Sequence, residues 1–184
     1  MQTIAQIFAQ SGQDEYYGEP VTQLEHALQC AQLAEQAGAD DETVVAAFLH
    51  DIGHLLPPVN SAVGSAEGYM DGYGTIDHER LGADFLRQRG FSEKIGQLIE
   101  HHVNAKRYLV YKQPEYRARL SEASTQTLMF QGGPMTTDEA TQFEQNPYFR
   151  EILQVRGWDE RAKEIDLPTP GIEHYLALCE RVRR

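Results

Sequence analysis

The sequence contains few cysteines and no long hydrophobic run. Cys30 and Cys179 are the only cysteines among 184 residues, and they are too few and too far apart for a disulfide framework or a zinc knuckle. No apolar stretch is long enough to cross a bilayer, and the first twenty residues lack the basic start and apolar centre of a secretory signal. We therefore expect a cytoplasmic protein without a membrane partner, in which Cys30 is a reduced core thiol.

Basic residues are also scarce. The chain has 16 Lys and Arg against 28 Asp and Glu, and its net charge is −12. Proteins that bind nucleic acids need a basic surface for the phosphate backbone, so we expect no nucleic-acid partner. Lys106, Arg107 and Lys112 are nevertheless clustered in sequence. This cluster either binds a small anion or is a solvated helix end.

The remaining composition is that of a globular protein, with 41% hydrophobic and 24% charged residues. A chain of this length suits a single domain over residues 1–184. Helical periodicity and helix caps recur along it, and no segment has a convincing strand period. The sequence predicts an all-α helical bundle. The predicted helical segments are residues 20–38, 40–56, 77–90, 92–109, 114–130, 136–145, 146–160 and 171–184.

One long loop interrupts this pattern. Residues Leu55 to Ile76 are rich in Pro, Gly and Ser. A loop of this length in a compact domain is usually a lid, a binding loop or a disordered segment.

Histidines are distributed over successive predicted helices. His26 lies in the first, His50 in the second, His78 opens the third and His102 ends the fourth. A single helical histidine is more often structural than functional. Imidazoles and carboxylates that converge from several helices are, however, a usual way to bind iron, manganese, zinc or nickel in a bundle.

The stretch "FLHDIGHLL" places polar residues in an apolar run. Adjacent helical residues point about 100° apart, so His50 and Asp51 converge on one centre only near a helix end, and Gly53 is suitably placed to produce one. With two carboxylate oxygens, a buried Asp51 can bridge two metal ions, which would offset the cost of burying its charge. On the first helix, His26 is expected to face inward.

These residues carry a resemblance to a known superfamily. His26, the pair His50-Asp51 and a late Asp159 form the pattern H…HD…D, which resembles the signature of the HD-domain superfamily of metal-dependent helical proteins. The additional His78 and His102 match the subset of that superfamily that holds two metals.

The flanking segments resemble a smaller branch, the phosphonate-cleaving mixed-valent di-iron oxygenases of the PhnZ type. The similarity extends over residues 15–176, and "HHVNAKRYL" and "QGGPM" are its most specific segments. The resemblance implies an Fe(II)/Fe(III) pair, no organic cofactor, and oxidation of a 1-hydroxyalkylphosphonate by O₂. The implied substrate is a 1-hydroxy-2-(amino or trimethylammonio)ethylphosphonate, which would yield glycine or glycine betaine and inorganic phosphate. The Leu55–Ile76 loop is where the chain departs from the family pattern.

The resemblance also assigns roles to individual residues. One iron would be bound by His26, His50 and Asp159 and the other by His78 and His102, with Asp51 as the bridge. The phosphonate would be bound by His54, Lys106, Ser124 and Arg156. Tyr16 and Glu19 would lie over the amino end of the substrate, in an N-terminal segment, residues 1–21, that covers the site. No catalytic residue is implied beyond the metal ligands.

Two other functions are compatible with the sequence. HD-domain proteins are mostly phosphohydrolases, in which the metals activate water, and the chain is alternatively a non-catalytic metal-dependent sensor or binding module. A related inositol-cleaving di-iron oxygenase is much longer than this chain. We expect a monomer or a small homo-oligomer, a structural role for His174, and no assigned role for His101.

Overall fold

The computed structural model describes residues 3–56, 70 and 74–183. These residues contain eleven α-helices, one short 3₁₀ helix (η1) and no strand beyond a single bridge between Glu15 and Thr22. The predicted all-α class is therefore confirmed. The elements are α1 (Ile4–Ser11), α2 (Gln23–Gln36), α3 (Asp41–Leu49), η1 (Ile52–Leu55), α4 (His78–Arg87), α5 (Glu93–Glu100), α6 (His102–Lys112), α7 (Pro114–Arg117), α8 (Glu122–Phe130), α9 (Thr137–Phe143), α10 (Phe149–Arg161) and α11 (Ile172–Val182).

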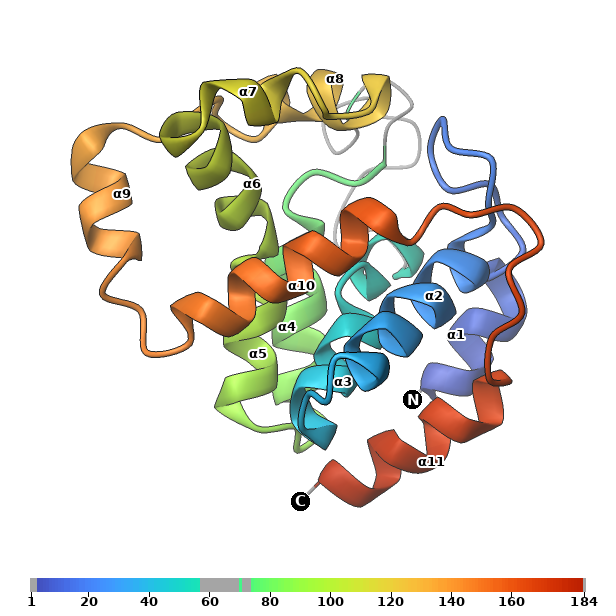
Figure 1. The fold of residues 1–184 in the computed structure, drawn as a ribbon. Helices are drawn as coiled ribbons and strands as arrows, with labels where there is room; N and C mark the ends of the chain where they lie inside the picture. Colours follow the sequence, from blue (N-terminus) through green and yellow to red (C-terminus); the bar gives the residue numbers. More distant parts are fainter. Residues whose placement is uncertain (1–2, 57–69, 71–73, 184) are drawn as a thin grey trace, which may run out of the picture.

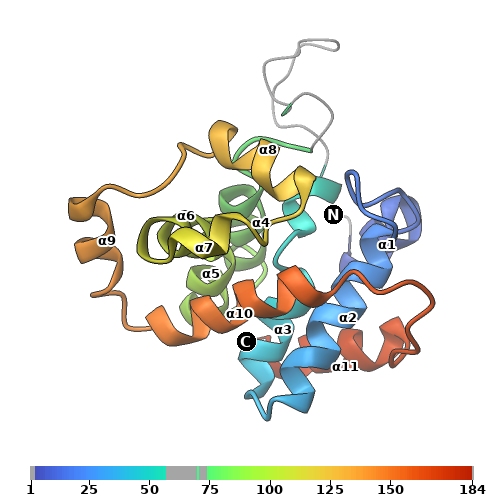
Figure 2. The same cartoon turned by 45° about the horizontal axis from the view of Figure 1, so that its top comes forward.

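Helix α3 is the centre of the bundle. It packs against α2, α5, α10 and α11, which surround it in Figure 1. All seven of its residues from Thr43 to Leu49 are buried, as expected for a helix enclosed by others. Helices α7 and α8 run across one end of the bundle, next to α6 (Figures 1 and 2).

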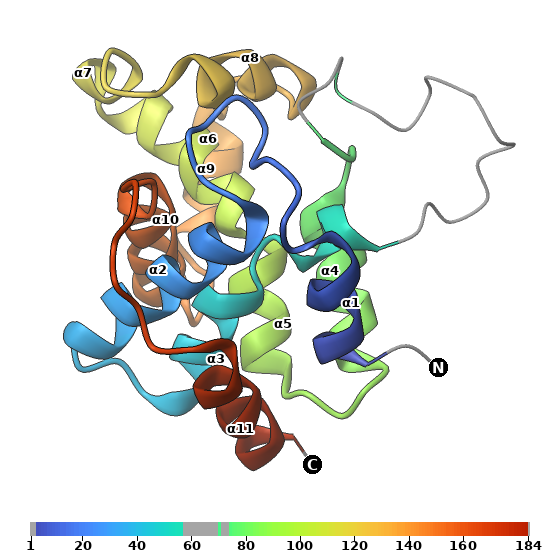
Figure 3. The same cartoon turned by 90° about the vertical axis from the view of Figure 1, so that its right-hand side faces the viewer.

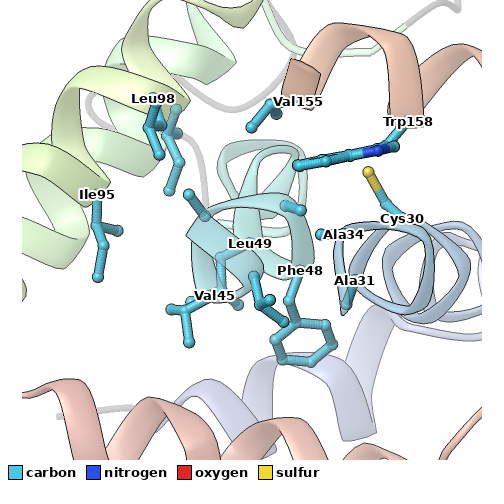
Figure 4. Close-up of a cluster of buried hydrophobic side chains, with 14 of the residues drawn as sticks. Cys30, Ala31, Ala34, Val45, Phe48, Leu49, Ile95, Leu98, Val155 and Trp158 are labelled. Carbon is cyan, nitrogen blue, oxygen red and sulfur yellow. The ribbon is translucent and has the colours of Figure 1, made fainter. Parts of the chain in front are cut away.

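The apolar core is formed where α2, α3, α5 and α10 meet (Figure 4). Cys30 is fully buried there as a free thiol, as predicted. The Phe48 ring stacks on Phe8, with ring centroids 5.1 Å apart, and on Tyr175 at 5.4 Å. Phe48 thus joins α3 to both α1 and α11.

Replacing Phe48 should be strongly destabilising. The side chain is 1% exposed, and truncating a buried Phe to Ala costs about 3–5 kcal/mol through lost burial and the cavity that remains. We expect Phe48→Ala to lower the urea midpoint of unfolding by an amount corresponding to that cost. Ile165→Ala, at a side chain that is 66% exposed, is the control and should leave the midpoint within experimental error.

Helix boundaries follow the predicted caps at the start of the chain. The Thr22 hydroxyl accepts from the Glu25 N–H while the Glu25 carboxylate accepts from the Thr22 N–H, which is a complete capping box. Gly38 follows the helix with φ +73°, a left-handed conformation that glycine adopts without strain. The Asp40 side chain caps α3 by accepting from the Thr43 N–H.

Three predicted helices are each broken in two. The segment 40–56 is divided into α3 and η1. The segment 92–109 is interrupted at His101, whose φ of −106° and ψ of 4° end α5, so His102 opens α6 and does not end a helix as predicted. The segment 114–130 is interrupted before Ser121, whose hydroxyl accepts from the Ser124 N–H and starts α8. At Ser121 a serine side chain replaces the backbone partner that a continuous helix would supply.

The N-terminal segment is divided between core and surface. Residues 4–11 form α1, and Ile7 and Phe8 on this helix are buried in the core. In Figure 3 the chain after α1 rises toward the end of the bundle where α8 lies. A covering role for the segment 1–21 is therefore reasonable only for residues 12–21.

Several predictions are not tested by the fold. Most of the Leu55–Ile76 loop, residues 57–69 and 71–73, lies outside the described residues. Among the helices that the structure does describe, none combines the length and the apolar character needed to span a membrane. The cytoplasmic location and the oligomeric state stay predictions.

Candidate metal centre

The end of α3 brings His50 and Asp51 to one point. The helix stops at Leu49, and Asp51 has φ −102° and ψ 9° before η1 begins at Ile52. The regular helix thus ends between these two residues, as the sequence predicted. As a result, His50 Nε2 lies 3.3 Å from Asp51 Oδ2.

A glycine brings the next helix close to this turn. A Cβ atom on Gly53 would lie 1.9 Å from the backbone oxygen of His78, so only glycine permits this approach of η1 to α4. The close contact places His78 Nε2 3.3 Å from Asp51 Oδ1.

Four histidines form two pairs on either side of Asp51. His26 Nε2 and His50 Nε2 are 3.2 Å apart, and so are His78 Nε2 and His102 Nε2. Asp51 Oδ2 faces the first pair, at 3.7 Å from His26 and 3.3 Å from His50. Asp51 Oδ1 faces the second pair, at 3.3 and 3.4 Å. The carboxylate therefore offers one oxygen to each pair, which is the geometry of a bridging ligand.

Backbone carbonyls determine the tautomers of three of these rings. Because a carbonyl only accepts, each contacting Nδ1 donates its hydrogen, and each Nε2 presents a lone pair. Two lone pairs 3.2 Å apart repel each other unless a cation or a proton lies between them. The donor set thus fits metal ions. The three contacts are His26 Nδ1 with the Ala162 oxygen at 2.8 Å, His50 Nδ1 with Ala47 at 2.9 Å, and His102 Nδ1 with Ile99 at 2.7 Å.

The fourth ring faces a carboxylate. His78 Nδ1 lies 3.3 Å from Glu79 Oε2, and neither buried atom has a hydrogen-bond partner within the described part of the chain. A carboxylate behind a metal-binding histidine is a common arrangement that orients the ring and raises its basicity. The sequence reasoning did not identify Glu79.

Asp159 on α10 completes the first pair. Its Oδ1 lies 3.5 Å from His26 Nε2 and 3.8 Å from His50 Nε2, and its Oδ2 accepts from Arg156 Nη1. Burial opposes ionisation of this carboxyl, but the Arg156 guanidinium holds the pKa of Asp159 well below its usual range. Burial likewise opposes ionisation of Asp51. When a proton takes the place of a cation between the imidazoles, the resulting charge on His50 and the imidazole hydrogen bonds hold the pKa of Asp51 well below its usual range. Both acids are therefore available as anionic ligands.

A pocket lies directly over this centre. Asp51, Asp159, His78 and His102 form part of its wall. The structure thus brings together every predicted site residue, with His26 and His50 beneath the pocket. The predicted substrate-binding residues that line it are Tyr16, Glu19, His54, Lys106, Ser124 and Arg156.

His54 acts as a hydrogen-bond donor to the pocket. Nitrogen atoms of His54 and His78 lie close enough to Asp51 to hold a metal ion together. His54 Nδ1, however, accepts from the Thr75 N–H at 3.0 Å, and burial, together with the nearby His78, lowers the pKa of His54 well below its usual value. In this neutral ring Nε2 carries the hydrogen, so it donates and does not bind a metal.

Lys106 is a buried cation without a carboxylate partner in the described residues. Its Nζ donates to Thr127 Oγ1 at 2.9 Å and to the Ser124 backbone oxygen at 3.4 Å. Burial, and secondarily the charge of Arg156, lowers the pKa of Lys106 to about 7. The Arg156 Nη2 is also buried and has no hydrogen-bond partner among the described residues. A buried ammonium without a carboxylate partner, together with an unsatisfied buried guanidinium nitrogen, indicates an anion site.

The other members of the basic cluster point elsewhere. Arg107 pairs with Glu139, and Lys112 pairs with Glu144. Only Lys106 of the three lines the pocket. The alternative of a solvated helix end thus applies to Lys112, which is 45% exposed.

Tyr16 and Glu19, the two N-terminal site residues, both form contacts with other side chains of the pocket. The Tyr16 ring stacks on His26, with centroids 3.9 Å apart, and its hydroxyl donates to Asp51 Oδ2 at 2.9 Å. Burial and the charge of Asp51 raise the pKa of Tyr16 well above its usual value, so the hydroxyl keeps its hydrogen. Glu19 Oε1 accepts from Lys163 Nζ at 2.5 Å.

Sequence reasoning missed two pocket residues that interact with predicted ones. Thr127 lies one helical turn after Ser124, and this spacing of hydroxyls on one face was a usable signal. Lys163 gave no signal, because it lies in the loop after α10 and meets Glu19 144 positions away in sequence.

The remaining histidines lie outside the centre. His101 Nδ1 contacts the Asn104 side chain at 2.8 Å, and His101 lines a separate groove beside α9. His174 lies on the surface and pairs with Glu35, in agreement with its predicted structural role.

Comparison with known proteins agrees with the geometry. Residues 24–129 match the HD domain. This chain belongs to the HD-domain family. The HD-domain assignment made from His26, His50, Asp51 and Asp159 is therefore confirmed.

Three relatives resemble this HD-domain protein over most of their length. It is 44% identical to the [1-hydroxy-2-(trimethylamino)ethyl]phosphonate dioxygenase (glycine-betaine-forming) of Leisingera caerulea, over 97% of this chain and 88% of the relative. It is 40% identical to a hydroxymethylphosphonate dioxygenase of Gimesia maris, over 87% and 77%. It is 41% identical to an uncharacterised protein of Acanthamoeba polyphaga mimivirus, over 96% and 78%. The predicted resemblance to phosphonate-cleaving oxygenases is confirmed by these relatives.

Proposed function

We propose that this HD-domain protein is a di-iron oxygenase that cleaves the carbon–phosphorus bond of a 1-hydroxy-2-(amino or trimethylammonio)ethylphosphonate. The products would be glycine or glycine betaine and inorganic phosphate. One observation carries the proposal: Asp51 offers one oxygen to each of two buried imidazole pairs, directly below a pocket with buried cationic groups. Both functionally named relatives are phosphonate dioxygenases.

The proposed metals are two iron ions. His26, His50 and Asp159 would hold one and His78 and His102 the other, with Asp51 between them. Imidazole and carboxylate ligands suit several transition metals, and the oxygenase names of the relatives favour iron. When bound, the iron pair supplies the redox chemistry that dioxygen requires. Oxidation of a hydroxyphosphonate to a carboxylic acid and phosphate incorporates both oxygen atoms and consumes four electrons from the substrate, so no organic cofactor is needed.

The phosphonate would lie among Lys106, Arg156 and His54. A phosphonate dianion accepts several hydrogen bonds, and charge-assisted bonds from a buried ammonium and guanidinium are the strongest available. The neutral His54 ring adds an N–H donor without adding charge. Ser124 and Thr127 contribute hydroxyls from one face of α8. These groups hold the phosphonate in a fixed orientation beside the Asp51 bridge.

The opposite end of the substrate would face Tyr16 and Glu19. An aromatic ring and a carboxylate attract a cation by cation–π and charge interactions. Tyr16 already contacts both His26 and Asp51, so the covering segment 12–21 joins the substrate's amino end to the metal centre.

Oxygen dependence tests the proposal. Iron-loaded protein is incubated with 2-amino-1-hydroxyethylphosphonate or its trimethylammonio analogue, and phosphate release and oxygen consumption are measured together. We expect one phosphate per O₂, and no phosphate in an anaerobic sample. Phosphate released without O₂, or hydrolysis of a phosphate ester such as p-nitrophenyl phosphate, would instead support the phosphohydrolase function. Binding without turnover would support a sensor.

The pH dependence of kcat/KM should follow the ionisation of the Lys106 ammonium. The ammonium is charged below its pKa of about 7 and is lost from the free enzyme as the pH rises, so kcat/KM should fall above pH 7. In Lys106→Arg the guanidinium stays charged over the whole range. Ionisation of the substrate is the same for both enzymes. A falling limb near pH 7 in the parent that is absent from Lys106→Arg is expected; identical profiles would contradict this assignment.

A further inference from the structure

Lys163 occupies a site with the chemistry of an ammonium receptor. Its Nζ donates to Glu19 Oε1 at 2.5 Å and to Ser121 Oγ at 3.4 Å. The same nitrogen lies 5.9 Å from the centroid of the Tyr16 ring. Lys163, Glu19 and Tyr16 all line the pocket over the metal centre. A carboxylate, a hydroxyl and an aromatic face thus surround the chain's own ammonium.

The backbone on both sides of Lys163 is fixed. The preceding carbonyl, that of Ala162, accepts from His26 Nδ1. The following residue, Glu164, is held by Gln29 on α2, whose side chain donates to its carbonyl at 2.7 Å and accepts from its N–H at 3.0 Å. Lys163 is therefore held in place by contacts with α2, and only its flexible side chain is able to leave Glu19.

We propose that Lys163 is a specificity-determining residue, which competes with a cationic substrate end for Glu19. This inference rests on the proposed function and deepens it. Glu19 and Tyr16 are the groups proposed to receive the substrate's ammonium, and in the free protein Lys163 already contacts both. A cationic substrate must displace this ammonium, whereas a hydroxyphosphonate with an uncharged end leaves the pair intact.

The burial of the pair makes this competition significant. The Lys163 and Glu19 side chains are 16% and 10% exposed, so the pair is screened less by water than an exposed one. Two cations cannot both be neutralised by one partly buried carboxylate without mutual repulsion. Lys163 should therefore reduce the preference of the pocket for cationic substrates relative to neutral ones.

Binding measurements without turnover test this role. Dissociation constants of iron-loaded protein are measured by anaerobic titration calorimetry for two ligands, 1-hydroxy-2-(trimethylammonio)ethylphosphonate and hydroxymethylphosphonate. In Lys163→Met we expect the cationic ligand to bind about tenfold more tightly relative to the neutral one, a factor equal to about 1.4 kcal/mol. Adding Glu19→Gln to this variant should abolish the gain, because the carboxylate that receives the cation is then absent.

Two variants separate charge from structure. Lys163→Arg keeps a cation beside Glu19 and should keep the parental ratio of affinities. Lys112→Met removes one positive charge from an exposed pair with Glu144 and should also keep it. An unchanged ratio in Lys163→Met, an equal loss of affinity for both ligands, or no binding of the cationic ligand to any variant would overturn the proposal. Because no O₂ is present, this outcome is independent of the oxygen-dependent assay that tests the proposed function.

Discussion

Asp51→Ala protein should be purified with almost no metal, although only one of the proposed ligands has been changed. The Asp51 oxygens face both imidazole pairs, at 3.3 Å from His50 on one side and 3.3 Å from His78 on the other. Removing a bridge takes one ligand from each ion and also removes the negative charge that separates two cations. Since loss of a mere outer-shell partner already costs 10–100-fold in affinity, we expect each ion to bind at least about a hundredfold more weakly. Elemental analysis after reconstitution with iron measures the result.

Two further variants serve as controls for Asp51→Ala. Of the two imidazole pairs, Asp159 contacts the one formed by His26 and His50, so Asp159→Ala should lose one ion and keep the other. Asp41→Ala, at a side chain that is 58% exposed and pairs with Arg181, should keep both. If Asp51→Ala retains two irons per chain, Asp51 is not the bridge.

Lys106→Met should lose activity and gain stability. The variant lacks the buried ammonium that faces the phosphonate. Loss of one partner from a buried charge pair costs about 2–5 kcal/mol, which corresponds to a decrease of about 30-fold to about 4,000-fold in kcat/KM. The loss should be similar for cationic and neutral substrates, because both carry the phosphonate. Iron content should stay at the parental level, since Lys106 contacts no proposed metal ligand among its hydrogen-bond partners.

The gain in stability follows from the same burial. The pKa of Lys106 is about 7 in the folded protein against 10.5 as the ordinary value, so between these pH values the unfolded chain binds more protons. Stability of the parent therefore rises with pH over this window, and at lower pH the buried ammonium is a cost. Methionine fills the same space without a charge, so Lys106→Met should have the higher Tm at neutral pH. Lys112→Met should alter neither Tm nor kcat/KM. An unchanged kcat/KM in Lys106→Met would remove Lys106 from the substrate site.

Local signals in the sequence were sufficient for much of the fold. Two helix caps have partners within three residues: Thr22 pairs with Glu25, and Asp40 caps the apolar helix that follows it. Neighbouring residues in the sequence are therefore sufficient to identify them. The break at His101 has no such local signal. His101 has φ −106° and ψ 4°, and the helix that follows begins with His102, whose Nε2 lies 3.2 Å from His78 Nε2.

The candidate site was likewise predictable only in part. The pattern of histidines and acids predicted which residues would meet, and the structure brings them within 4 Å of one another as two sets around Asp51. Contacts that join distant, irregular segments were not predictable. Lys163 lies in a loop and contacts Glu19, which is 144 positions away, and no periodicity or spacing relates the two. Glu79 is the neighbour of His78 in the sequence, but its role depends on the orientation of the His78 ring, whose Nδ1 faces the Glu79 carboxylate in the structure.

Electron paramagnetic resonance combined with metal analysis tests the central claim most directly. Protein reconstituted with iron and partly oxidised should contain two irons per chain. It should also give the signal of a coupled Fe(II)/Fe(III) pair with a net spin of one half, because the Asp51 carboxylate connects the two ions. The same preparation of Asp51→Ala should lack that signal. One iron per chain, or the signal of an isolated ferric ion alone, would contradict a bridged pair at these histidines.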